Sequence, residues 1–217
     1  MTHEGLTSGA LWLMLLLGAY HGLNPGMGWL FAVALGMQEQ KGSTVAKSLA
    51  PIAIGHALAV GGVLAIALLL GNLLPLMVIR MAVAALLIGL GIFILVRHWH
   101  PRWVRMQVGF GDLTLWSFLM ASAHGAGLML VPVILGGGTA AAAVQVAGHN
   151  HGAAMTSPLD GLVATGVHTA GYLVVTGLIA WVVYQKLGLA ILRKAWFNVD
   201  LLWAGALVAT GLITLFV

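Results

Sequence analysis

Charged side chains are scarce in this chain. Of its 217 residues only 6% are Asp, Glu, Lys or Arg, whereas 61% are hydrophobic. A water-soluble domain carries about 25% charged residues, so this composition cannot cover a water-facing surface. It excludes a soluble enzyme or nucleic-acid-binding domain and predicts an integral membrane protein in contact with the lipid bilayer.

Cysteine is absent altogether. The chain therefore has no disulfide framework, no CxxC redox pair and no thiolate metal site. Any metal ion would have to be bound by nitrogen, oxygen or thioether ligands. The net charge of +4 at pH 7 does not predict a nucleic-acid partner, because the nine Lys and Arg residues are dispersed over short loops and form no basic patch.

Long apolar runs predict an all-α integral membrane protein with six transmembrane helices, because a bilayer-spanning helix needs roughly 20 apolar residues. The runs are Ser8–Met37, Ser48–Gly71, Leu76–Val96, Asp112–Leu135, Leu159–Tyr184 and Val199–Val217. The first run is too long for one straight crossing and contains Asn24-Pro25-Gly26. Proline lacks an amide hydrogen, so we expect the first helix to be broken there.

The positive residues indicate how the chain is oriented. Eight of the nine Lys and Arg residues fall in the loops after the first, third and fifth spans, and only Arg80 lies on the other side. Loops rich in Lys and Arg stay in the cytoplasm. We therefore predict a multi-pass protein of the cell membrane with both termini on the extracytoplasmic side.

The chain also repeats itself, because His-containing segments of the first and second spans recur in the fourth and fifth. The matched residues are His21 with His124, and His56 with His168. Each half has three helices, and an odd number inverts the second half relative to the first. We predict two inverted three-helix repeats, residues 1–100 and 101–217, in one membrane domain. Such repeats are common in secondary transporters, whose binding sites lie near the midplane between the halves.

Four histidines lie inside apolar spans, namely His21, His56, His124 and His168. Ionisable residues in a bilayer are costly and are candidates for function, although a single buried histidine that bonds a carbonyl is more often structural. Four at repeat-related positions favour a shared metal site or pathway. Neutral imidazole suits Ni, Co, Zn, Cu and Fe, so we expect a transition-metal ion. The four rings either converge or form a ladder across the membrane.

Other candidate residues lie close to these histidines along the chain. Asn24 is next to the predicted break, where freed carbonyls would line a cavity. Met27 and Met129 offer thioethers that would favour Cu(I), with packing as the alternative. Thr169 and Tyr172 are candidates to bind a solute or to fix an imidazole tautomer, with a hydrogen bond to helix backbone as the alternative.

The segment from His21 to Gly26, His-Gly-Leu-Asn-Pro-Gly, is followed by Gly55-His56-Ala57, and His56 lies 35 residues after His21. This pattern resembles the nickel/cobalt efflux permeases of the lysine-exporter-like superfamily. The resemblance covers the first two spans and implies a six-helix permease with His21 and His56 on its metal pathway. Met27 stands where the family pattern has a second histidine, and Asn24 where it is often acidic. The metal, or a non-metal solute, is therefore left open.

The leading hypothesis is a permease that moves a transition-metal cation by alternating access. His21 and His124 would form its central site near mid-bilayer, with His56 nearer the cytoplasm and His168 nearer the outside. The alternative is a membrane-embedded metalloprotein or metalloenzyme, with a fixed His-ligated metal or a haem. A transporter is favoured over an enzyme because no Ser-His-Asp arrangement, phosphate loop or HExxH motif is present. A homo-oligomer is left open.

Overall fold

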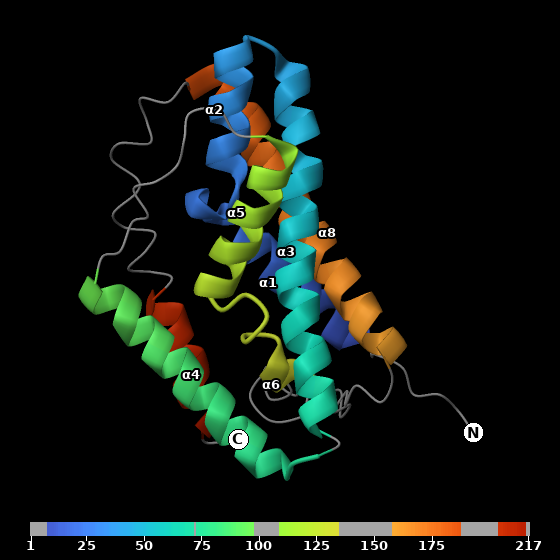
Figure 1. Cartoon of the computed structure of the whole chain (residues 1–217), viewed down its shortest axis with the longest axis vertical. Coiled ribbons are helices and arrows are strands. Elements are labelled where there is room, and N and C mark those ends of the chain that lie inside the picture. The colour runs from blue at the N-terminus through green and yellow to red at the C-terminus, as the bar shows by residue number, and fades with distance from the viewer. Residues whose placement is uncertain (1–7, 72, 98–108, 135–157, 188–203, 216–217) are drawn as a thin grey trace.

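The computed structural model describes residues 8–71, 73–97, 109–134, 158–187 and 204–215. Within these ranges the protein is helical and contains no strand, so the predicted all-α class is confirmed (Figure 1). The expected start of the sixth span at Val199 lies outside the described residues.

The helices follow the predicted spans, with two of those spans divided. The first half contains α1 (Ser8–Leu23), the short 3-10 helix η1 (Pro25–Met27), α2 (Trp29–Glu39), α3 (Gly42–Gly71) and α4 (Leu76–Arg97). The second half contains α5 (Phe110–Ala123), α6 (Val131–Ile134), α8 (Pro158–Val182), the π-helical turn η2 (Val183–Leu187) and the helix Ala204–Leu215.

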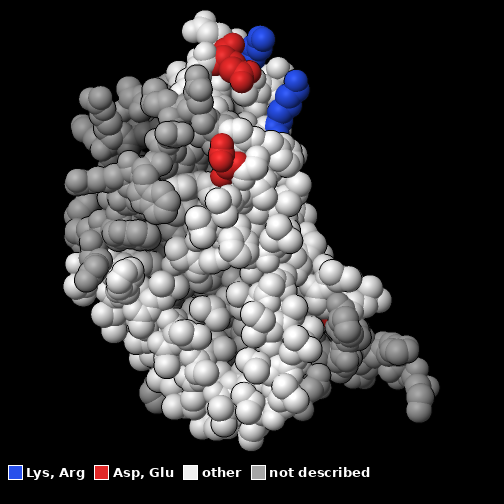
Figure 2. All heavy atoms as spheres, viewed as in Figure 1, with Lys and Arg blue, Asp and Glu red and all other residues white. Residues whose placement is uncertain are grey.

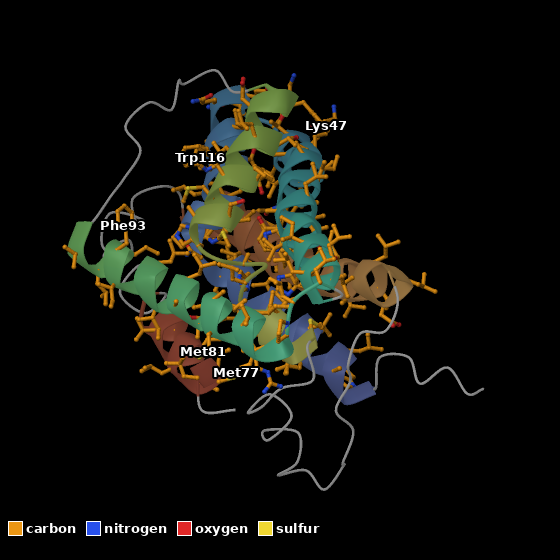
Figure 3. All side chains as sticks on the ribbon, turned by 60° about the horizontal axis from the view of Figure 1, so that its bottom comes forward. Lys47, Met77, Met81, Phe93 and Trp116 are labelled. Atoms are coloured by element: carbon orange, nitrogen blue, oxygen red, sulfur yellow. The ribbon has the colours of Figure 1, made fainter. Side chains whose placement is uncertain are left out.

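Apolar helices dominate the described part of the chain. Three of them are long and apolar enough to cross a membrane, namely Gly42–Gly71, Met77–Val96 and Leu159–Lys186. Large exposed apolar side chains lie along α4, including Met77, Met81 and Phe93 (Figure 3). An exposed apolar surface of this extent is rare on soluble proteins and suits contact with lipid chains, as the composition predicts.

The predicted break in the first span is present. α1 ends at Leu23, and the side-chain oxygen of Asn24 caps η1 by accepting a hydrogen bond from the Gly26 amide at 2.9 Å. Gly28 then has a φ of 141°, which side-chain-bearing residues rarely adopt. The indole N–H of Trp29, the first residue of α2, donates to the Leu23 carbonyl at 3.1 Å. One of the carbonyls freed by the break is thereby paired.

A second break divides the fourth span. The sequence predicts one continuous helix over Asp112–Leu135, but α5 ends at Ala123, and residues 124–130 form a turn before α6. The prediction of a continuous helix is therefore wrong. Gly125 has a φ of 67° in this turn, and glycine in the left-handed region commonly ends a helix. Both breaks lie beside a His-Gly pair, because α1 ends one residue after Gly22 and the second break begins with His124 and Gly125.

Helices of the first half of the chain pack mainly against helices of the second half. The most extensive contacts join α1 to α8 and α3 to α5, and α3 also packs on α8. α4 lies to one side of this bundle, packed against the helix Ala204–Leu215 (Figure 1). The four helices α1, α3, α5 and α8 therefore form the central bundle.

Glycines bring the backbones of the central helices into direct contact. A Cβ atom on Gly18 of α1 would overlap the carbonyl oxygen of His168, and one on Gly171 of α8 would overlap that of Leu15. Gly55 of α3 meets the backbone of α5 in the same way. Small residues allow this approach in membrane helices, where packing takes the place of the hydrophobic effect.

Charged side chains gather near one end of the molecule on the face that Figure 2 shows. Lys41 directly precedes α3, Lys47 lies in its second turn, and Lys186 lies in η2, which contacts α2. Figure 3 labels Lys47 at this end. We call it the lysine end. α3 runs away from it, whereas α8 runs toward it (Figure 1).

The glycine contact between α1 and α8 predicts a position-specific effect of alanine. The G171A methyl group would meet the Leu15 backbone, so we expect a loss of about 1–3 kcal/mol in the free energy of unfolding, typical of overpacking. The same change at Gly166 of the same helix meets nothing within 4 Å. G166A should be neutral or stabilising by up to about 1 kcal/mol, because alanine favours helix. Unfolding of both purified variants in one detergent checks this, and equal effects would contradict it.

Candidate functional site

Three of the four intramembrane histidines meet inside the central bundle. His21 of α1, His56 of α3 and His168 of α8 are each 0% exposed. Their ring centroids lie 5.9 Å apart for His21 and His56, 5.0 Å for His21 and His168, and 5.4 Å for His56 and His168. One imidazole from each of three helices, drawn from both halves of the chain, thus forms what we call the histidine cluster.

The cluster resolves the choice between convergence and a ladder for these three residues. The apolar runs place His56 nearer the cytoplasm and His168 nearer the outside. α3, however, begins at Gly42 rather than at Ser48, which at about 1.5 Å per residue moves His56 about 9 Å further from the start of its helix. The expected difference in depth is therefore largely removed.

Backbone carbonyls set the tautomers of two rings. His21 Nδ1 lies 2.7 Å from the Leu17 carbonyl oxygen, and His168 Nδ1 lies 3.2 Å from that of Met14. A carbonyl only accepts hydrogen bonds, so each Nδ1 carries a proton and donates. In the neutral ring the lone pair is then on Nε2. Metal-binding histidines are commonly oriented by this kind of bond from the second ring nitrogen.

His56 is held by stacking instead. Its ring lies on that of Tyr172, with centroids 3.9 Å apart and 10° between the planes. Within the described residues, neither nitrogen of His56 nor Nε2 of His168 has a hydrogen-bond partner. Leaving a buried polar atom unpaired costs about 1–3 kcal/mol. These nitrogens are therefore the atoms at which a ligand or water would be stabilised most.

Tyr172 connects the cluster to the broken helix. Its hydroxyl donates a hydrogen bond to the Met27 carbonyl of η1, while its ring covers His56. Met27 is 1% exposed and belongs to the apolar core, and it is its backbone carbonyl that accepts the hydrogen bond from Tyr172. Tyr172 thus makes a hydrogen bond to backbone, the alternative that the sequence left open, while its ring stacks on His56 of another helix.

The remaining predicted residues are buried in different places. The Asn24 oxygen caps η1, and its amide nitrogen has no partner among the described residues. Thr169 follows His168 directly, and its hydroxyl likewise lacks a partner in the part that the structure describes. Met129 is buried in the turn between α5 and α6, where it packs in the apolar core, which favours packing over a ligand role.

His124 directly follows α5 and is the first residue of the second break. It is 9% exposed, and its Nδ1 lies 2.8 Å from the Met120 carbonyl oxygen, one turn earlier in the helix. His21 makes the same bond to the residue four positions before it. The sequence predicts His21 and His124 as the central pair. These two imidazoles lie close enough to interact electrostatically, and the ring contacts above bring His21 together with His56 and His168 as well.

Ser117 and Thr176 are among the buried polar residues that were not singled out from the sequence. Ser117 of α5 donates a hydrogen bond of 2.7 Å to the Ile52 carbonyl and so links α5 to α3. Thr176 is 0% exposed, and its hydroxyl has no partner among the described residues. The sequence feature that could have identified Thr176 is its position eight residues after His168, which places both residues on one face of α8.

The rings of the cluster are not arranged around a common point. In the described ranges, no group of three or more His, Asp or Glu side chains has the geometry to hold a metal ion. The centroid separations are nevertheless close to the roughly 5 Å expected for imidazoles that bind one ion tetrahedrally through nitrogens at about 2.0–2.1 Å. A shared ion would therefore require reorientation of the rings rather than a large displacement of the helices.

The same separations disfavour haem at the cluster. A haem bound between two of the histidines would place its macrocycle where the third ring lies, because each ring lies within 5.9 Å of the other two. The described cluster therefore suits a single ion better than a porphyrin.

No protein-family model matches the chain, and no curated protein or solved structure is significantly similar to it. The resemblance to nickel/cobalt efflux permeases therefore stays a prediction that rests on the motif in the first two spans. The geometry of the histidine cluster is the basis on which a function is assigned.

Removing the Tyr172 hydroxyl tests the link between the cluster and the break. Y172F keeps the ring stacked on His56 but leaves the Met27 carbonyl without its donor. We expect a loss of about 1–3 kcal/mol in unfolding free energy, the usual cost of an unpaired buried group. The matched control is Y184F at a partly buried tyrosine, where a change within about 0.5 kcal/mol is expected. Thermal unfolding in detergent measures both, and a Y172F protein as stable as the wild type would refute the link.

Proposed function

We propose that the protein is a membrane permease that carries a transition-metal cation of the Ni, Co, Zn, Cu or Fe group by alternating access. The observation that carries this proposal is the contact of three fully buried imidazoles from three helices inside a bundle with an apolar exterior. His21, His56 and His168 would bind the cation, and His124 would act as a relay at the second break.

The chemistry of the cluster supports a cation of intermediate softness. Imidazole nitrogen suits these metals, whereas Mg²⁺ and Ca²⁺ prefer oxygen ligands. The acidic residues of the described ranges, Glu39, Asp112 and Asp160, lie at or near helix ends. Neutral ligands leave the charge of the cation uncompensated, so a bound ion would be held weakly enough to be released, as transport requires.

The two helix breaks support movement of a solute past the cluster. The first break lies two residues after His21, and the second begins at His124. Irregular backbone in a membrane is tolerated where it lines a cavity or is buried in protein, and discontinuous helices commonly form transporter binding sites. In this proposal the breaks are the joints about which parts of the two halves move.

The packing of first-half helices against second-half helices supports two inverted three-helix repeats. If α1 corresponds to α5 and α3 to α8, the contact of α1 with α8 corresponds to that of α5 with α3, and these two contacts are the most extensive. The equivalent histidines, His21 and His124, make the same backbone bond. The proposal therefore has six spans, with the lysine end in the cytoplasm and both termini outside.

Metal uptake into proteoliposomes tests the proposed function. The purified protein should transport at least one ion from a panel of Ni²⁺, Co²⁺, Zn²⁺, Cu⁺ and Fe²⁺, but not Mg²⁺. H21A, H56A and H168A should each lower the rate by about tenfold or more, because loss even of a residue that only supports a metal ligand costs about 10–100-fold in metal affinity or activity.

The matched control is H100A, which removes a histidine outside the apolar spans and should transport at the wild-type rate. Reconstituted amounts and unfolding temperatures of all variants are measured in parallel. Wild-type protein that moves none of the five ions, or cluster variants with unchanged rates, would overturn the proposal.

A further inference from the structure

Polar side chains extend from the histidine cluster along one direction of α8. His168, Tyr172 and Thr176 follow at intervals of four residues and therefore share a helix face. All three are fully buried. The series runs toward the lysine end, where α8 passes into η2, and Thr176 lies about 12 Å along the helix from His168 at about 1.5 Å per residue.

In the opposite direction along the same helices, four buried positions carry apolar side chains. We call this set the apolar layer, and it consists of the fully buried Met14 of α1, Val60 and Leu64 of α3, and Ala164 of α8. Ala164 precedes His168 by one helix turn, and Val60 follows His56 by one turn. The cluster therefore has polar neighbours toward the lysine end and apolar neighbours toward the other end.

Unpaired polar atoms make this asymmetry energetically important. Within the described residues, the Thr176 hydroxyl, both nitrogens of His56 and Nε2 of His168 have no hydrogen-bond partner. Buried water normally satisfies such atoms, but a water molecule needs two to four polar partners to be stable in an interior. Partners of this kind lie between the cluster and Thr176, whereas the side chains of the apolar layer supply none.

We infer that the histidine cluster is reached from the lysine end, through a hydrated path along the face of α8 that carries Tyr172 and Thr176, while the apolar layer closes it from the opposite end. Tyr172 lies where the path meets the cluster, since its ring covers His56 and its hydroxyl holds η1. The role of this path as a route for a metal cation rests on the proposed function. Its hydration does not depend on a metal.

Cysteine accessibility tests the inference directly, because the natural chain contains no cysteine and each introduced thiol is read without background. T176C places the thiol on the path, and A164C places it in the apolar layer at an equally buried position of the same helix. K47C, at an exposed position of the lysine end, reports which side of the membrane a reagent reaches. A small, membrane-impermeant methanethiosulfonate is applied to vesicles of the intact protein.

We expect T176C to react from the same side as K47C and at least about tenfold faster than A164C, a factor that corresponds to about 1.4 kcal/mol. Should T176C fail to reach the membrane, A180C, one turn closer to the lysine end on the same face and equally buried, replaces it. Equal rates at the path and apolar-layer positions, or faster reaction of A164C from the side opposite K47C, would overturn the inference.

Failure of the hydrated path and failure of the proposed transport function give different experimental results. If T176C is labelled but the protein transports no metal, the hydrated path is supported and the proposed metal transport is wrong. If the protein transports metal normally but T176C does not react from the K47C side, metal transport is supported and the hydrated path is wrong.

Discussion

The direct backbone contact between α1 and α8 determines where the histidine cluster forms. Gly18 and Gly171 have no side chains, so each lies against a carbonyl oxygen of the partner helix. The same contact places His168 within hydrogen-bond distance of the Met14 carbonyl and sets its ring beside His21. A separation of α1 from α8 by even one methyl group would disturb both relations, because hydrogen bonds weaken over a few tenths of an ångström.

Burial in a membrane explains why the buried polar side chains without hydrogen-bond partners lie in so few places. Unpaired polar groups are expensive away from water, and most buried hydroxyls of the described helices bond to backbone, as Ser48, Ser117 and Thr214 do. The exceptions gather around the cluster and along α8 toward the lysine end. The buried imidazoles, the helix breaks beside them and the unpaired polar atoms on one side are the features on which the proposed permease function rests.

The sequence predicts the helices and the first break well, because apolar runs and a proline act locally. The second break was missed, since Gly125 and Gly127 are weak signals among 30 glycines. The sequence left convergence of His56 with His168 open beside a ladder, because hydropathy locates the hydrocarbon boundary and not the first turns of a helix. α3 starts with the polar turns from Gly42 to Lys47, so an apolar window underestimates how deep His56 lies.

The central claim is that one cation is shared by imidazoles from three helices. Anomalous X-ray diffraction from the protein loaded with the transported metal tests it most directly. We expect one anomalous peak among His21, His56 and His168, about 2.0–2.1 Å from the coordinating ring nitrogens. A peak elsewhere in the protein, with none within coordinating distance of these three rings, would contradict it.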